Sequence, residues 1–493
     1  MILAIDQGTT GTTISITTSQ GQEVGRAYKE FQQYYPKPTW VEHDPLEIWQ
    51  VTQDGLLQAL EAAELTAGDI SCIGITNQRE TTVVWHKETG EPLYNAIVWQ
   101  CRRSAELCQQ IKKSGKANWL HQKTGLMVDA YFCATKLQWL FNEKPELKAL
   151  AEQGKLAFGT IDSWLMWQLS GGEAHCTDHS NASRTLFYNI HQQKWDDDLL
   201  AFFDIPKSIL PTIKASAGLF CHSSAKGFLG VKIPITGVSG DQQSALFAQQ
   251  CTQAGMIKNT YGTGCFMLMY TADQAYFSDN GLLTTIACDK NGQPAYALEG
   301  AVFIAGAGVQ WLRDQLQLID HADETEALAL SVTDNNGVYF VPAFSGLGAP
   351  HWNMQARGQI SGLTQGCTKA HIVRATLEAI AFQSYDLMQL MQQESSIKIK
   401  QLKVDGGACA NNFLMQFQAD LLDITINRPA NIESTVLGAT ILAAMGNNIW
   451  CAETVPEILY GRGDSFSGQL PKTACNSLVA DWHNAVKNCL VDK

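Results

Sequence analysis

Asp6-Gln-Gly-Thr-Thr10 and Thr260-Tyr-Gly-Thr-Gly264 carry the same design, in which a turn rich in glycine and threonine joins two extended, apolar runs. Small residues in a tight turn leave backbone amides free to surround an anion, and glycine lets the main chain approach it closely. One such turn is common, but two in matching positions predict two hairpins, over 2–18 and 256–270, that hold one polyphosphate from opposite sides. The repetition predicts an α/β fold of two duplicated domains with a cleft between them.

The residues around the first turn predict the elements of an α/β domain. A strand over 2–5 and an extended run over 12–18 flank the turn, and extended structure resumes over 73–76. Between them, Asp44-Pro45 combines an N-cap with proline at the first helical position, which predicts a helix of roughly twenty residues. The apolar residues of this helix are Leu46, Ile48, Trp49, Leu56, Leu57 and Leu60. Strands, a helix and strands again are typical of a mixed sheet with helices on its faces.

The same pattern returns later in the chain. A strand over 233–238 leads through Gly240-Asp241 into a helix over 242–250, so we expect a second α/β unit to begin near residue 230. We place the boundary near residue 245, which gives an N-terminal domain of residues 1–245 and a C-terminal domain of residues 246–493.

A third junction of strand, glycine and helix occurs further on. A strand over 402–405 ends at Gly406-Gly407, and a helix follows over 411–422. The amides at the start of such a helix can receive a nucleotide.

Composition narrows the class of protein. With 493 residues, 45% of them hydrophobic and 17% charged, the chain can form more than one core. Its net charge of −13 repels a polyphosphate backbone, so nucleic acid is excluded as a partner. The fourteen cysteines form no C-x-x-C pair, and no export signal or membrane span is evident. We therefore expect a protein of the reducing cytoplasm.

The known phosphate-binding loops are absent from the sequence. Neither G-x-x-x-x-G-K-[ST] nor G-x-G-x-x-G occurs, so the two hairpins must form a different cradle. Asp6 ends the first strand, where its carboxylate can hold Mg²⁺ directly or through water.

Further segments occur in an order that resembles the FGGY carbohydrate kinases, and among them the glycerol kinases, from end to end. They are Gly74-Ile-Thr-Asn-Gln-Arg-Glu-Thr-Thr82, Asn95-Ala-Ile-Val-Trp-Gln-Cys-Arg-Arg103, Gly240-Asp-Gln-Gln243, Asn259-Thr-Tyr-Gly-Thr-Gly-Cys-Phe266, Asn280-Gly-Leu-Leu-Thr-Thr285 and Val404-Asp-Gly-Gly407. The resemblance implies two ribonuclease-H-like domains, as in actin, hexokinase and the Hsp70 ATPase, that close on ATP. It also implies ATP- and Mg²⁺-dependent phosphorylation of glycerol to sn-glycerol 3-phosphate, the first step of glycerol catabolism, by a homo-oligomer (a dimer or a tetramer).

The resemblance also implies the roles of individual residues. Asp241 is the implied general base and, with Asp6, a metal ligand. The implied glycerol-binding residues are Arg79, Glu80, Trp99, Tyr131, Asp241, Gln242 and Phe266. The implied nucleotide-binding residues are Thr9, Thr10, Gly11, Thr263, Gly306, Gln310, Gly407 and Asn411.

Two positions depart from the family pattern. Thr13 stands where many glycerol kinases carry an arginine near the ATP phosphates, so nucleotide affinity or donor preference is in question. Cys133 stands where serine, threonine or proline is usual.

Three other functions are compatible with parts of the sequence. The chain could be an FGGY kinase of another polyol or a ketose, although the set of Arg79-Glu80, Trp99 and Tyr131 favours glycerol. It could be an ATPase like actin or Hsp70 that needs no small acceptor. It could also be a nucleotide-binding regulator without catalysis, against which the retention of Asp6, Asp241 and both hairpins argues.

Overall fold

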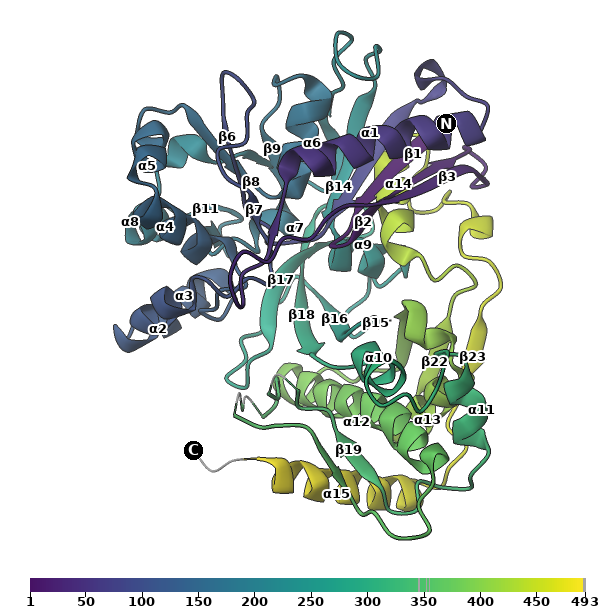
Figure 1. Ribbon diagram of the computed structural model, residues 1–493. Helices are drawn as coiled ribbons and strands as arrows, with labels where there is room; N and C mark the ends of the chain where they lie inside the picture. The colour runs from purple at the N-terminus through teal and green to yellow at the C-terminus, as the bar shows by residue number, and fades with distance from the viewer. Residues whose placement is uncertain (345, 352, 354, 491–493) are drawn as a thin grey trace.

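Two large sheets organise the chain in the computed structural model, which describes residues 1–344, 346–351, 353 and 355–490 (Figure 1). The first sheet has the order β13-β14-β5-β1-β2-β3, and the second has the order β17-β18-β16-β15-β21-β22-β23. The strands of the first sheet are β1 (Ile2–Gln7), β2 (Gly11–Thr17), β3 (Glu23–Glu30), β5 (Cys72–Asn77), β13 (Ala217–His222) and β14 (Pro234–Gly240). The strands of the second sheet are β15 (Ile257–Tyr261), β16 (Cys265–Ala272), β17 (Leu283–Cys288), β18 (Pro294–Val302), β21 (Gln401–Asp405), β22 (Thr425–Arg428) and β23 (Asp464–Phe466).

The two sheets share one pairing scheme. A central strand pairs antiparallel with the next strand and parallel with a later one: β1 with β2 and β5, and β15 with β16 and β21. A further antiparallel strand (β3 or β18) and a further parallel strand (β14 or β22) extend each sheet in the same way. This equivalence confirms the α/β fold of two duplicated, ribonuclease-H-like units.

The strand expected over 233–238 is present as β14, but it belongs to the first sheet. It pairs in parallel with β5, with Val238 opposite Ile75. The expectation that a second unit begins near residue 230 is therefore wrong. A buried apolar run predicts a strand but does not say which sheet the strand joins.

Two helices, α9 (Asp241–Ala248) and α14 (Ser434–Gly446), lie between the sheets (Figure 1). Helix α9 contacts strands of both sheets, and α14 packs on β1, β5 and β14 although its sequence lies far along the chain. Glycines allow this close packing: a Cβ on Gly74 would lie 2.2 Å from the carbonyl oxygen of Ala439, and one on Gly438 would lie 2.1 Å from that of Ser244. The helix expected over 242–250 thus begins at Asp241, which places this carboxylate between the sheets.

Helices α1 (Pro45–Ala62) and α6 (Ile161–Ser170) cover the outer face of the first sheet. Helix α1 is predicted correctly, with Asp44 as N-cap, since its side chain accepts a hydrogen bond from the amide of Leu46. Of the six expected apolar residues, Leu46 and Leu57 are exposed, at 52% and 55%, and Trp49 is half-buried. The small residues Thr52 and Gly55 lie on the buried face instead, because the sheet lies too close there for large side chains.

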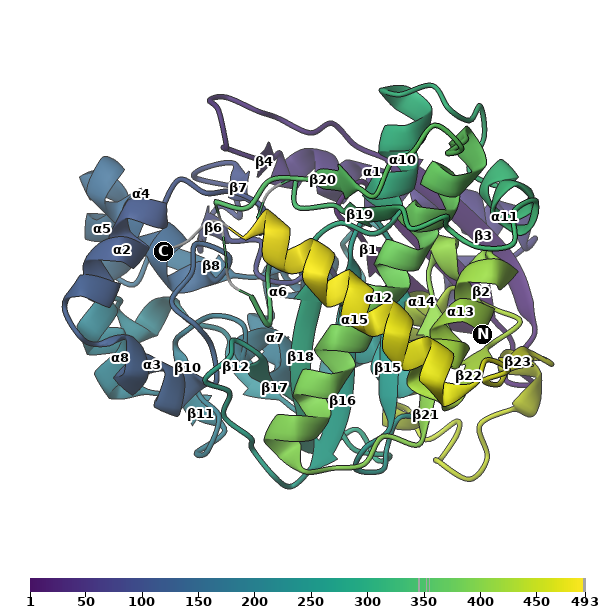
Figure 2. The same ribbon diagram turned by 90° about the horizontal axis from the view of Figure 1, so that it is seen from below.

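Helices also cover the outer face of the second sheet. They are α10 (Gly306–Asp314), α11 (Glu324–Leu330), α12 (Lys369–Ser395), α13 (Asn412–Leu422) and α15 (Lys472–Cys489). Figure 2 shows α15 crossing α12, where the indole of Trp482 donates to Asp386. No helix in the described part of the chain is long and apolar enough to cross a membrane.

The remaining elements form a mainly helical subdomain beside the first sheet and a few short sheets (Figure 1). The helices of the subdomain are α2 (Ala105–Lys113), α3 (Ala117–Thr124), α4 (Cys133–Glu143), α5 (Pro145–Glu152) and α8 (Asp197–Phe203), whereas the short helix α7 (His179–Ala182) contacts β14 of the first large sheet and β17 of the second. The strand pairs are β4 (Glu42–His43) with β7 (Ala96–Ile97), β6 (Val83–His86) with β8 (Leu156–Gly159), β9 (Cys176–Asp178) with β12 (Thr212–Lys214), β10 (Tyr188–Asn189) with β11 (Lys194–Trp195), and β19 (Tyr339–Val341) with β20 (Gln359–Ser361). Segments of this subdomain bring Trp99 and Tyr131 to the space between the two large sheets.

Candidate active site

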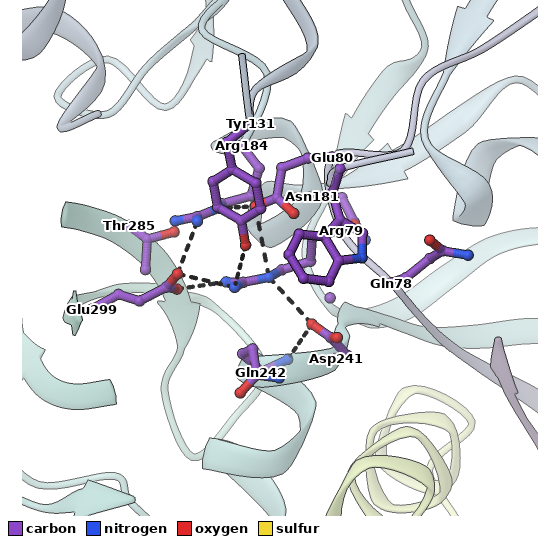
Figure 3. Close-up of polar contacts among 12 residues, drawn as sticks. Gln78, Arg79, Glu80, Tyr131, Asn181, Arg184, Asp241, Gln242, Thr285 and Glu299 are labelled. Atoms are coloured by element: carbon purple, nitrogen blue, oxygen red, sulfur yellow. Dashed lines mark hydrogen bonds and ion pairs between the residues drawn. The ribbon is translucent and has the colours of Figure 1, made fainter. Parts of the chain in front are cut away.

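Arg79 lies at the centre of a buried charged cluster between the two sheets (Figure 3). It follows β5, and its guanidinium donates to both carboxylate oxygens of Glu299 on β18, at 2.6 and 3.0 Å. Its Nε lies 3.2 Å from Oδ1 of Asp241. Because Glu299 belongs to the second sheet, this side chain joins the two halves of the molecule.

Arg184 completes the cluster from the loop after α7. Its Nε lies 2.5 Å from Glu80 and its NH2 group lies 2.9 Å from Glu299. Burial acts to raise the pKa of Glu299, but Arg184 and Arg79 together lower it to about 2, so this carboxylate is ionised. Burial also raises the pKa of Glu80, against the opposing effect of both arginines. The two guanidinium groups therefore hold the carboxylates in fixed positions.

Glu80 adopts a backbone conformation that is unusual for a residue with a side chain, with φ at +61°. Its carbonyl oxygen accepts hydrogen bonds from Lys136 Nζ at 2.9 Å and from Cys133 Sγ at 3.3 Å. The same Nζ donates to the carbonyl of Tyr131 at 2.7 Å. Lys136 thus links the turn of Glu80 to the segment of Tyr131, and Cys133 fits this arrangement as a donor despite its departure from the family pattern.

Asp241 is the first residue of α9 and remains accessible, with 29% of its side chain exposed. Burial raises the pKa of its carboxyl, and Arg79 opposes the shift. Burial and the charge of Asp241 raise the pKa of Asp6 to about 8. The Asp6 carboxylate makes no hydrogen bond or ion pair with any side chain in the described residues.

Two mutually repelling carboxylates are a donor set that suits Mg²⁺, which takes one or two carboxylates and completes its shell with phosphate and water. No group of three or more histidine, cysteine, aspartate or glutamate side chains in the described part of the chain could hold a metal ion alone. Asp6 and Asp241 therefore fit a Mg²⁺ that arrives with a nucleotide.

Three predicted aromatic residues meet beside this cluster. The ring of Trp99 lies edge-on to Tyr131 at 5.7 Å and to Phe266 at 6.3 Å between centroids. The Trp99 indole nitrogen donates to the hydroxyl of Thr9 in the first hairpin at 2.9 Å. The Tyr131 hydroxyl lies 3.5 Å from Arg79. The aromatic rings thus form an apolar wall next to polar groups that can bind hydroxyls.

A glycine amide closes each hairpin turn, across three residues in the first turn and two in the second. The amide of Gly8 donates to the carbonyl of Gly11, and the amide of Gly262 donates to the carbonyl of Gly264, both at 2.9 Å. Thr10 and Thr263 are exposed at the two turns, whereas Gly11 is buried against Tyr28.

The other predicted nucleotide residues lie on the side of the second sheet. The amide of Gly306, at the start of α10, donates to the carbonyl of Gly262 at 3.0 Å, and a Cβ on Gly306 would lie 2.7 Å from that oxygen. Gln310 is exposed on the same helix, and Gly407 is exposed, with no atom within 4 Å of the position that a Cβ would occupy. Asn411 is the N-cap of α13, since it accepts from the amide of Leu414 at 2.9 Å and its amide group donates to Thr325.

Sequence reasoning missed Glu299 and Arg184, and also Lys258, a buried cation on β15 that donates to Gln242. Glu299 and Lys258 each lie in an otherwise uncharged strand, and a lone charge in such a strand is a signal that sequence reasoning can use. Arg184 follows a short helix in a loop, and no local pattern marks it.

Two facing sheets with the same strand pairing, each with a glycine- and threonine-containing hairpin turn, are the architecture of a two-domain kinase of the actin-like ATPase class. The chain belongs to the FGGY family of carbohydrate kinases, whose N-terminal domain model matches residues 1–248 and whose C-terminal domain model matches residues 257–446.

Similar proteins span the whole chain. The glycerol kinase of Alkaliphilus metalliredigens is 51% identical over 490 residues, which are 99% of this chain and 98% of that protein. Glycerol kinase 2 of Thermotoga maritima is 50% identical over 489 residues, with 99% and 98% coverage. Among solved structures, Plasmodium falciparum glycerol kinase with ADP has a TM-score of 0.94 and 36% identity, and covers 100% of this chain and 98% of its own.

Proposed function

We propose that this protein transfers the γ-phosphoryl group of ATP to a terminal hydroxyl of glycerol, giving sn-glycerol 3-phosphate and ADP, as the first step of glycerol catabolism. The observation that carries the proposal is that Arg79, Glu80, Trp99, Tyr131 and Asp241 meet in one place between the two hairpins. The full-length similarity to proteins named glycerol kinase supports the choice of acceptor. Solved structures of gluconate and xylulose kinases share the fold at 22% identity and carry no argument for another acceptor.

In this proposal, the residues around Arg79 bind and orient the polyol. Arg79 and Glu80 pair with its hydroxyls, Tyr131 and Gln242 add contacts, and Trp99 and Phe266 cover its carbon chain. A site with paired donors and acceptors for three hydroxyls discriminates against acceptors that leave some of them unpaired. Closure of the two halves excludes water, which would otherwise accept the phosphoryl group.

Asp241 acts as the general base of the transfer. The carboxylate accepts a hydrogen bond from the attacking hydroxyl, orients its oxygen toward phosphorus, and takes the proton as the new oxygen–phosphorus bond forms. The bond from the γ-phosphorus to the bridging oxygen breaks, and ADP leaves. Burial raises the pKa of the Asp241 carboxyl, which favours proton uptake, and the positive charge of Arg79 opposes this shift.

The nucleotide lies between the hairpins in this proposal. Thr9, Thr10 and Gly11 bind the phosphates from one side and Thr263 from the other, while Gly306, Gln310, Gly407 and Asn411 surround the base and ribose. Mg²⁺ bound by Asp6 and Asp241 would neutralise charge on the phosphates. Since the Asn411 side chain already caps α13, its contribution to nucleotide binding is through the helix end that it shapes.

Other properties follow as parts of the same proposal. All fourteen cysteines are free thiols, which suits a reducing cytoplasm. We further propose a homo-oligomer, a dimer or a tetramer, and a domain boundary near residue 245.

A coupled assay of ADP release from MgATP tests the function. We expect strong stimulation by glycerol and little by erythritol, xylitol, dihydroxyacetone or xylulose. Asp241→Asn should lower kcat by about 100- to 10,000-fold while glycerol still binds, because the base is lost and the pocket is kept. Stimulation by another acceptor would overturn the substrate, ADP release independent of any acceptor would indicate an ATPase, and a wild-type kcat in the variant would remove Asp241 from its role.

A further inference from the structure

Lys258 is a buried cation beside the proposed site to which no role above has been given. It lies on β15 with 0% of its surface exposed. Its Nζ donates to Gln242 Oε1 at 2.5 Å and to Thr260 Oγ1 at 2.6 Å. The ammonium group therefore connects the residue next to Asp241 with the start of the second hairpin turn, which the proposed function places beside the phosphoryl group in transfer.

The charge of Lys258 is not balanced by a carboxylate in contact. Both hydrogen-bond partners are neutral, and no ion pair of this ammonium occurs among the described residues. Asp405 and Asp241 act on it at longer range, and burial lowers the pKa of the amine. A buried ammonium without a contacting anion is costly, and that cost falls when an anionic ligand arrives. An ammonium has three donors, so two are used here and one remains for a ligand.

The other cations near the site are already engaged, since Lys136 is held by the carbonyls of Glu80 and Tyr131 and the two arginines have anionic partners. Arg79 is paired with Glu299 and Asp241, and Arg184 with Glu80 and Glu299. In the two hairpins, residues 2–18 and 256–270, Lys258 is the one basic residue, because Thr13 leaves the first hairpin without a cation. Any direct positive charge that the hairpins offer to a polyphosphate must therefore come from Lys258.

We propose that Lys258 binds a non-bridging oxygen of the phosphoryl group as that group moves from ATP to the polyol oxygen. The inference rests on the proposed function and adds a second contact to the transfer step. The bridging oxygen–phosphorus bond breaks, the polyol oxygen–phosphorus bond forms, and the hydroxyl proton passes to Asp241. Lys258 stays protonated and neutralises charge on the phosphoryl oxygens, which is where charge is spread in the transition state.

The test compares Lys258→Gln with Lys258→Arg. Glutamine keeps a donor toward Thr260 and removes the charge, whereas arginine keeps the charge. We expect Lys258→Gln to lower kcat by at least 100-fold with a change in glycerol Kd of less than threefold, and Lys258→Arg to recover at least tenfold of that loss. Lys403 is the register partner of Lys258 on β21 and donates to the carbonyl of Gln249, so Lys403→Gln is the matched control with an expected kcat within twofold of wild type.

A second measurement separates transfer from folding and from simple binding. MgADP with aluminium fluoride and glycerol mimics the group in transfer, and Lys258→Gln should weaken this complex by about the same factor as kcat, while MgADP alone binds as in wild type. Equal kcat in Lys258→Gln and wild type, or a loss confined to the glycerol KM, would overturn the role. If the wild-type protein does not phosphorylate glycerol, the proposed function fails; the same comparison with an acceptor that is phosphorylated still decides the role of Lys258.

Discussion

Trp99 contacts both parts of the candidate site, because its ring packs against Tyr131 and Phe266 and its indole nitrogen donates to Thr9. Removing a buried aromatic surface of this kind costs about 1.5–3 kcal/mol, which corresponds to roughly 10- to 100-fold in affinity. We expect Trp99→Ala to raise the KM for glycerol by that factor with a smaller change in kcat. Trp99→Phe keeps the wall and loses the bond to Thr9, so it should mainly raise the KM for ATP. Steady-state kinetics with glycerol and ATP varied in turn would check both variants. An unchanged glycerol KM in Trp99→Ala would mean that Trp99 has only a packing role and does not contact glycerol.

At the scale of residues, sequence reasoning identified site residues that lie in family motifs. It missed the partners that those residues contact from distant parts of the chain. Arg79 and Glu80 lie in such a motif, and the structure brings them together with Asp241. Glu299 is 220 positions from Arg79 along the chain, and Arg184 approaches from a loop. A pairing of this kind depends on how two sheets face each other, which no local pattern contains.

At the scale of elements, the sequence predicted which helices and strands exist better than it predicted where they lie in the fold. The helix that begins at Pro45 and the strand that precedes Asp241 are both present, because capping and apolar runs are local signals. The expectation that the strand over 233–238 starts a second unit was wrong, because β14 pairs with β5 of the first sheet, and the apolar Leu46 and Leu57 of α1 are exposed. Both depend on how closely the neighbouring elements pack, which is a tertiary property.

Helix α14 packs very closely against α9, and a substitution at Gly438 measures how much the stability of the molecule depends on this contact. A Cβ on Gly438 would lie 2.1 Å from the carbonyl oxygen of Ser244 on α9, and a backbone atom cannot move away cheaply. We expect Gly438→Ala to lower the free energy of unfolding by at least about 2 kcal/mol through overpacking. Gly68→Ala is the control, since its Cβ would meet its nearest neighbour at 3.6 Å. Denaturant unfolding of both variants measures the difference, and equal stabilities would show that α9 and α14 can separate freely.

At the scale of the whole molecule, the fold and the family could be inferred from repeated motifs, whereas the contacts between the two halves could not. The duplicated hairpins predicted two facing units, and the two sheets have that relation. The charged cluster that joins them uses Glu299 from the second sheet and two arginines from the first half. Its energetic value depends on burial, which only the assembled structure reveals.

Glu299 is therefore the residue at which stability and polyol binding should be coupled across the molecule. Glu299→Gln keeps the shape and removes the charge that both Arg79 and Arg184 contact, and breaking a buried pair in this way typically costs about 3–5 kcal/mol. We expect a lower midpoint of thermal unfolding and, because Arg79 loses its two-point partner, a glycerol KM raised at least tenfold. The exposed pair of Lys290 and Glu453 provides the control, and Glu453→Gln should change neither quantity measurably.

Thermal unfolding with and without saturating glycerol separates the two effects. A ligand that binds only the folded state raises the unfolding midpoint, by an amount that grows with the ratio of its concentration to its Kd. If Glu299 couples the halves through Arg79, the shift caused by a fixed glycerol concentration should be smaller in Glu299→Gln than in wild type. An equal shift in a destabilised variant would mean that Glu299 supports the fold without positioning Arg79 for polyol binding.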